Sequence, residues 1–129
     1  MSDINGSSLI TCQVASDGGS IRLVFEAPDG RPASLTLPMQ CIQQLLMTLP
    51  HAASKAIRAR HHDDTLRLVF PLGNWKLERA AGDSKLILTL YTPDGFEVSF
   101  SVDHNAIEQM SRTAGSRAAT SSRGQLYLN

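Results

Sequence analysis

Apolar and polar residues alternate along most of this chain. Between residues 20 and 26, for example, Ile21, Leu23 and Phe25 fall on one face of an extended strand. Alternation with a period of two is typical of a strand with one buried face. The same pattern predicts seven strands, over residues 9–15, 20–26, 33–37, 65–70, 75–80, 85–91 and 96–102.

Pro-Asp-Gly occurs twice, at residues 28–30 and at residues 93–95, each time between two predicted strands. Proline presets φ at the first corner of a turn, and glycine tolerates the positive φ at which the chain reverses. Both triplets therefore predict tight turns that join their flanking strands into antiparallel hairpins.

Each series of strands is followed by a segment with helical spacing. We expect the first helix to begin at Pro38, where a missing N–H costs little, and to end at Pro50. Its apolar stripe consists of Ile42, Leu45, Leu46 and Leu49. The second helix is predicted to begin after Asp103, a good N-cap residue. Its apolar stripe consists of Ile107, Met110 and Ala114.

The two halves of the chain align without a gap when one is shifted by 65 residues. Both Pro-Asp-Gly triplets coincide, and Ile42 falls on Ile107. The match combines identical residues with apolar residues on the same predicted face, which favours a duplicated unit. The predicted fold class is α+β, with two tandem antiparallel β-meander-plus-helix repeats of period 65.

A single unit of this size gains little net stability from burying one sheet face and one helix stripe. We therefore expect the two repeats to pack as one domain about a pseudo-twofold axis, each helix covering a sheet. The predicted organisation is a flexible N-terminus over 1–8, a single domain over 9–115, and a flexible tail over 116–129. Within the domain we expect repeat one over 9–49, a connector over 50–64 with room for a further short helix before a polar turn, and repeat two over 65–115.

This layout is similar to the PUR repeat and Whirly families, which join strand-rich sheets to a following helix. The similarity covers residues 66–114 best, where the stretch 65–70 supplies a fourth strand, and residues 9–49 less well. The resemblance implies single-stranded nucleic-acid binding on sheet surfaces, through basic and aromatic residues.

The composition fits one neutral domain. The chain has 129 residues, of which 42% are hydrophobic, and its 12 basic residues balance its 12 acidic ones. A neutral chain has no overall attraction for nucleic acid or anionic lipid, so only a local patch would bind either. We find no signal peptide and no apolar run that could cross a membrane, and we therefore expect a cytoplasmic protein without membrane partners.

One local concentration of positive charge stands out, at the junction of the predicted repeats. Its residues, together with the lone tryptophan, are candidate contacts for an anion or for nucleic acid: Lys55, Arg58, Arg60, Arg67 and Trp75. The alternative is an ordinary solvated face. A lone tryptophan is also typical of a core or of a dimer contact.

The sequence places His61, His62, Asp63 and Asp64 in a row. Imidazole and carboxylate groups can bind zinc or nickel. Adjacent side chains on an extended chain point apart, however, so we favour a solvated connector, and no cofactor is predicted. A small-ligand or metal site between the repeats is a third hypothesis.

We recognise no catalytic constellation: there is no nucleophile elbow, no P-loop and no glycine-rich dinucleotide motif. Cys12 and Cys41 lack a Cys-x-x-Cys partner, so we expect buried thiols in preference to a disulfide or a reactive thiol. The end of the chain, "GQLYLN", is either disordered or an extra strand on an exposed sheet edge, its own or a partner's.

These observations favour a non-enzymatic cytoplasmic interaction or regulatory module, a homodimer that also binds an unknown protein partner. The alternative is a single-stranded nucleic-acid-binding protein of PUR/Whirly-like architecture.

Overall fold

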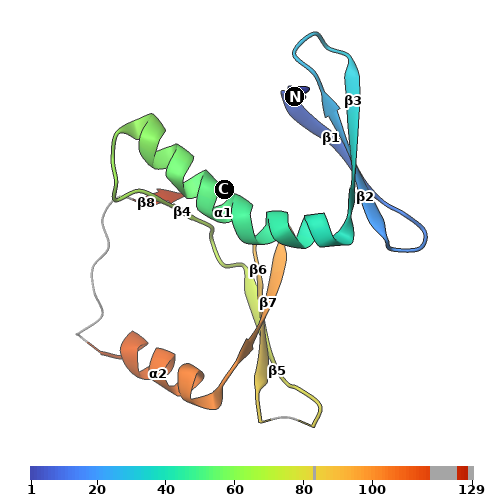
Figure 1. The fold of residues 1–129 in the computed structure, drawn as a ribbon. Helices are drawn as coiled ribbons and strands as arrows, with labels where there is room; N and C mark the ends of the chain where they lie inside the picture. Colours follow the sequence, from blue (N-terminus) through green and yellow to red (C-terminus); the bar gives the residue numbers. More distant parts are fainter. Residues whose placement is uncertain (83, 117–124, 128–129) are drawn as a thin grey trace. The chain divides into compact units, whose positions relative to one another are not determined.

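The computed structural model describes residues 1–82, 84–116 and 125–127. These residues form two antiparallel three-stranded sheets and two helices, which confirms the predicted α+β class (Figure 1). In chain order the elements are β1 (Ser8–Val14), β2 (Ser20–Glu26), β3 (Pro32–Pro38), α1 (Met39–His61), β4 (Arg67–Val69), β5 (Asn74–Arg79), β6 (Leu86–Tyr91), β7 (Glu97–Val102), α2 (His104–Ala114) and β8 (Gln125–Tyr127).

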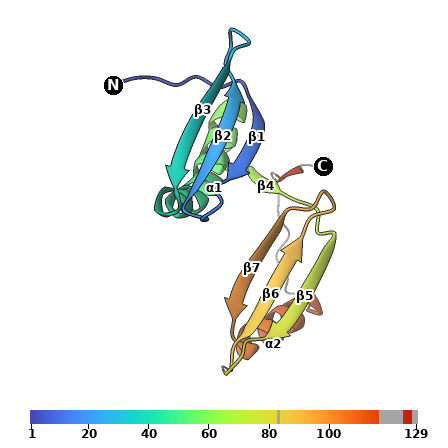
Figure 2. The ribbon, with the colours of Figure 1, turned by 90° about the vertical axis from the view of Figure 1, so that its right-hand side faces the viewer.

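The chain divides into two compact units, Met1–Ala53 and Ser54–Asn129, and the boundary falls inside α1. The first unit contains the β1-β2-β3 sheet, and the second contains the β5-β6-β7 sheet (Figure 2). The packing of both repeats into a single domain over 9–115 therefore stays a prediction. Among the described residues, no helix has the length and apolar character needed to cross a bilayer.

Each sheet has one apolar face, as the alternation predicted. Cross-strand rows on that face of the first sheet are Val14–Ile21–Leu37 and Cys12–Leu23–Leu35. The corresponding rows of the second sheet are Arg79–Leu86–Val102, Leu77–Leu88–Phe100 and Trp75–Leu90–Val98. The opposite face of the second sheet carries Thr89, whose hydroxyl lies 2.7 Å from that of Ser99.

The two sheets share one strand register when residue numbers are shifted by 65. Ile21 pairs with Leu37, and Leu86 pairs with Val102; Val14 pairs with Ile21, and Arg79 pairs with Leu86. The match includes the backbone hydrogen bonds that close both Pro-Asp-Gly turns. Ala27 N–H donates to the Arg31 carbonyl at 2.8 Å, and Thr92 N–H donates to the Phe96 carbonyl at 2.9 Å.

Both Pro-Asp-Gly turns are three-residue hairpin loops that end in a left-handed glycine. Gly30 has φ 83° and Gly95 has φ 95°, a region in which a residue with Cβ is strained. The sequence pattern therefore predicted these two turns correctly, together with the pairing of their strands.

A β-bulge in β1 is the one break in this shared register. The register shifts between Leu9 and Thr11, which leaves one extra residue in β1. N-terminal to the bulge the correspondence becomes 66 residues: Ser7 N–H donates to the Glu26 carbonyl, and Gly73 N–H donates to the Tyr91 carbonyl, both at 2.7 Å. A bulge of this kind absorbs one inserted residue without disturbing the rest of the sheet.

Two sequence predictions about the junction are wrong. The first helix does not end at Pro50 but continues to His61, so the connector predicted over 50–64 is largely helical. Proline removes only one helical hydrogen bond, and the alanine-rich stretch that follows, "HAASKA", favours helix.

The second error concerns the stretch 65–70. It adds no fourth strand to the β5-β6-β7 sheet, because β4 instead pairs in parallel with β8. Part of "GQLYLN" thus forms a strand that pairs with β4 of its own chain. Of the predicted tail, residues 117–124 and 128–129 lie outside the described residues.

Gly73 lies where the chain enters the second sheet, and substitution there is expected to destabilise the protein. A Cβ on Gly73 would lie 2.9 Å from the backbone nitrogen of Pro93, and that backbone cannot move away without disturbing the β6–β7 turn. We expect Gly73→Ala to lower the free energy of unfolding by about 1–3 kcal/mol, measured by urea denaturation. Gly115→Ala is the control, because its Cβ would come no closer than 3.7 Å to the Ser111 carbonyl. Equal stabilities of the two variants would contradict this prediction.

Candidate functional site

The residues of the predicted basic cluster lie on three elements. Lys55, Arg58 and Arg60 belong to α1, Arg67 begins β4, and Trp75 lies in β5. The structure brings two of these elements together, because Arg58 Nε donates to the Leu66 carbonyl at 2.8 Å, next to Arg67. Arg58 is therefore partly buried and holds the end of α1 against the start of β4. Lys55 and Arg60 are exposed and form no ion pair with another described residue.

The position of these cations has a structural reason. Arg58, Arg60 and His61 occupy the last turn of α1. The carbonyl groups at a helix C-terminus carry partial negative charge, which stabilises nearby cations. Much of the charge concentration seen in the sequence is thus explained by the end of one helix.

The row of two histidines and two aspartates forms the C-cap of α1. His62 N–H lies 3.4 Å from the Ala59 carbonyl, and Asp63 N–H donates to the Arg58 carbonyl at 3.1 Å. His62 has φ 51°, so the last turn closes as a Schellman motif with a histidine in the left-handed position.

Asp63 then closes a second turn. Its Oδ1 accepts the Thr65 N–H at 2.9 Å and the Thr65 hydroxyl at 2.6 Å. The hydroxyl bond, followed by the backbone bond, lowers the pKa of Asp63 below its usual value, because both stabilise the charged carboxylate. Within the described part of the chain, no three His, Cys, Asp or Glu side chains are grouped so that they could hold a metal.

His62→Gly is expected to stabilise the protein. The left-handed conformation costs a residue with Cβ on the order of 1 kcal/mol, and glycine avoids that cost. We expect the free energy of unfolding to rise by about 1 kcal/mol, measured by urea denaturation. His51→Gly in the middle of the same helix is the matched control, and it should lower stability by about 1 kcal/mol. A loss of stability in both variants would contradict the proposed capping role.

Trp75 lies in β5, on the apolar face of the second sheet, and not in the C-terminal turn of α1. Its side chain is 60% exposed, and that of Phe100 is 49% exposed. With Leu77 and Val98, these side chains expose on the order of 400 Å² of apolar surface. A patch of this size is comparable to the largest apolar patch on an ordinary monomer, and such patches are often functional.

The first sheet and both helices also leave apolar residues exposed. Leu9, Ile10 and Val14 of β1 are exposed, and no residue of α1 or α2 is buried. Among the described residues, the buried ones are Leu86 and Thr89, at 7% and 6% exposure. The apolar residues of the predicted helix stripes and sheet faces are therefore half-buried or exposed among the described residues, apart from Leu86.

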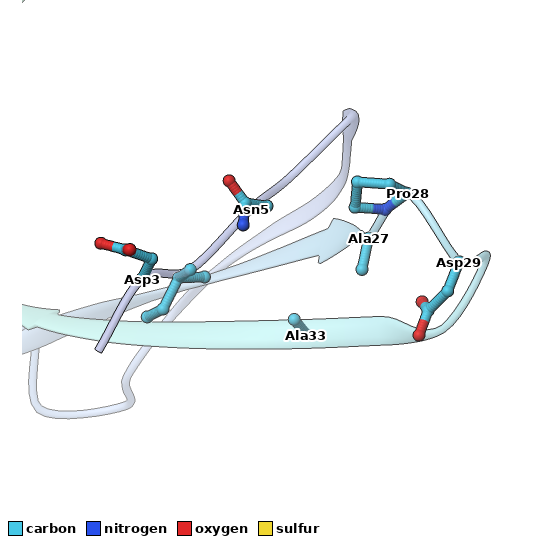
Figure 3. A pocket seen from close by; sticks show the side chains of 7 residues that line it. Asp3, Asn5, Ala27, Pro28, Asp29 and Ala33 are labelled. Carbon is cyan, nitrogen blue, oxygen red and sulfur yellow. The ribbon is translucent and has the colours of Figure 1, made fainter.

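A shallow hollow of about 530 Å³ lies beside the first Pro-Asp-Gly turn (Figure 3). Its lining consists of Asp3, Ile4, Asn5, Ala27, Pro28, Asp29 and Ala33. One of its two carboxylates is already engaged, because Asp29 Oδ1 accepts the Arg31 N–H at 3.0 Å. The lining offers no histidine, thiol or hydroxyl group that could act as base or nucleophile.

The two thiols differ from the prediction. Cys12 is exposed on β1 and Cys41 is half-buried on α1, and both are free. The expectation that both thiols are buried is therefore wrong for the single chain, in which neither Cys12 nor Cys41 is fully buried. The alternation predicted the face on which Cys12 lies, but a sequence pattern does not tell whether anything covers that face.

Comparison with known proteins finds no matching family model, no matching curated protein and no matching solved structure.

Proposed function

We propose that this chain is a non-enzymatic interaction or regulatory module that works as a homodimer in the cytoplasm. The observation that carries the proposal is the apolar face of the β5-β6-β7 sheet, which is exposed around Trp75 and Phe100. Covering about 400 Å² of apolar surface is worth on the order of 10 kcal/mol. A domain of this size is stable by only about 5–15 kcal/mol in total. Much of this gross gain is offset by the entropy lost on association, and we propose that the remainder holds two chains together.

The proposal includes duplication of one strand–strand–strand–helix unit. The register shared at a shift of 65 residues supports it, because the same pairings and the same turn hydrogen bonds recur in both sheets. We propose that the repeats pack about a pseudo-twofold axis, so that helix stripes cover sheet faces. The layout of the PUR repeat and Whirly families is of this kind.

The chemistry of the described surfaces supports binding in preference to catalysis. The hollow near Asp29 holds no histidine, thiol or hydroxyl group beside its carboxylates, and the row of histidines and aspartates serves to end α1. The chain instead exposes apolar surface, and burial of apolar surface drives much protein association.

Native mass spectrometry of the untagged protein tests this proposal, together with urea unfolding at several protein concentrations. We expect a mass of two chains with nothing added, and an unfolding midpoint that rises with concentration, as for a dimer whose subunits fold together. A single-chain mass with a midpoint independent of concentration would overturn the homodimer. Turnover of a metabolite by the pure protein would overturn the non-enzymatic role.

A second candidate is single-stranded nucleic-acid binding through Lys55, Arg58, Arg60, Arg67 and Trp75. It is favoured by the Arg58–Leu66 hydrogen bond, which sets the end of α1 beside Arg67. It predicts binding of a labelled oligonucleotide that weakens steeply with salt and is lost in Arg60→Ala, with Arg22→Ala on the first sheet as control. Unchanged fluorescence anisotropy at low salt would eliminate this candidate.

A further inference from the structure

The outer edge of β1 is an open edge of the first sheet. The first sheet has the order β1-β2-β3, so β1 pairs with β2 on one side only (Figure 2). Every residue of β1 is exposed, and Val14 is 68% exposed. An open edge of this kind presents unpaired N–H and carbonyl groups that can accept another strand.

The other edge strands of the two sheets carry features that hinder such pairing. β3 begins at Pro32 and ends at Pro38, β5 contains Lys76, Glu78 and Arg79, and β7 begins with Glu97. Prolines and charges are the usual means by which proteins prevent edge-to-edge association. β1 contains neither, since its sequence is Ser-Leu-Ile-Thr-Cys-Gln-Val.

The backbone groups that face outward can be assigned from the ladder. Ala15 N–H donates to the Ser20 carbonyl at 3.0 Å, so Ala15 points toward β2. Alternation then turns the N–H and carbonyl groups of Gln13 and Thr11 toward β2, and those of Cys12 and Val14 outward. The bulge between Leu9 and Thr11 limits the regular part of this edge to residues 11–15.

We propose that β1 pairs antiparallel with β1 of a second copy, centred on Gln13, so that two β1-β2-β3 sheets become one six-stranded sheet. Pairing the same strand about a twofold axis gives an isologous, closed interface. Centring on Gln13 sets Cys12 opposite Val14 of the second copy, so apolar side chains meet apolar ones on one face. Gln13 meets Gln13 of the second copy on the other face.

A second copy fits this edge better than an unrelated protein does. The edge has no charge with which to select a partner of different sequence, and charge complementarity is a main source of such selection. The symmetric register, in contrast, matches the apolar and polar rows of β1 with themselves. The joined sheets also present one continuous apolar face, larger than that of either sheet alone.

Val14→Pro tests the inference, which rests on the proposed homodimer. Proline at Val14 removes an outward N–H and no hydrogen bond to β2. Arg79→Pro is the matched control, because it occupies the equivalent outward position on the charged edge of β5. By sedimentation velocity we expect wild type and Arg79→Pro to be dimers, and Val14→Pro to dissociate at least 100-fold more readily with its circular dichroism spectrum unchanged.

The outcomes separate this inference from the proposed function. A dimer in Val14→Pro as tight as wild type would overturn the β1 pairing while leaving the homodimer intact, and equal weakening by both prolines would overturn it as well. A monomeric wild-type protein would overturn the homodimer itself.

Disulfide trapping gives a second measurement that does not depend on the proline variant folding. In a Cys41→Ser background, Val14→Cys sets a new thiol opposite Cys12 of the second copy, at a Cα separation suited to a disulfide. With copper–phenanthroline as oxidant, we expect a covalent dimer to form at least tenfold faster in Cys41→Ser, Val14→Cys than in Cys41→Ser alone. Equal rates would contradict the register.

Discussion

Phe100→Asp is expected to weaken self-association more than 100-fold. Phe100 is 49% exposed in one chain, so the substitution should cost the isolated chain little. In the proposed dimer the same side chain is covered, and a carboxylate at this position would be buried without a partner. We expect the free energy of association to weaken by about 3–5 kcal/mol, that is, a dissociation constant raised more than 100-fold. Sedimentation equilibrium measures this constant directly.

Ser101→Asp provides the matched control for this experiment. Ser101 follows Phe100 on the same strand, is exposed, and faces the opposite side of the sheet, in the row of Ile87 and Glu78. Both variants suffer the poor β-propensity of aspartate, so the difference between them reports the face alone. Dissociation constants within threefold of each other would show that the face of Trp75 and Phe100 is not an association surface.

The strands and their register were predictable because they depend on local chemistry. Alternation assigned the face of each residue, and the Pro-Asp-Gly turns fixed which residues lie opposite one another, down to Ile21 with Leu37 and Leu86 with Val102. A one-residue slip would move the whole apolar set to the other face, so a strand with one apolar face specifies its register strongly.

The junction was less predictable, because several weak preferences compete there. Pro50 disfavours a helix and the alanines after it favour one, and the structure shows that the alanines prevail. For the histidines at 61 and 62 the sequence favoured a solvated connector over a metal site, and in the structure they lie at the C-terminal end of α1. Asp63, two residues before Thr65, was the sequence signal for a turn at this point. Aspartate commonly accepts a hydrogen bond from the backbone N–H two residues further along, as Asp63 does here.

The pairing of β4 with β8 could not be read from the sequence. β4 (Arg67–Val69) and β8 (Gln125–Tyr127) lie far apart along the chain, and each has only three residues. Nor could the sequence reveal which apolar faces remain open. Alternation shows that a strand has an apolar side, as at Cys12, and says nothing about what lies against that side.

Truncation of two equivalent core positions tests whether both sheet faces are covered in the assembled protein. Leu86 is 7% exposed, and the equivalent residue of the first sheet, Ile21, is only half-buried in one chain. We expect Leu86→Ala to lower the free energy of unfolding by about 2–5 kcal/mol, as for a buried leucine. If helix stripes cover both sheet faces as proposed, Ile21→Ala should cost a similar amount, although Ile21 is only half-buried among the described residues.

Urea unfolding at one high protein concentration compares the free energies of unfolding of the two variants. Arg22→Ala, a truncation on the opposite face of β2, is the control. A cost of less than about 1 kcal/mol for Ile21→Ala, beside a full cost for Leu86→Ala, would contradict coverage of the first sheet. Equal costs would mean that Ile21 is covered in the folded protein beyond what its own unit provides. The energetic equivalence of residues 21 and 86 would then match the equivalence of their registers.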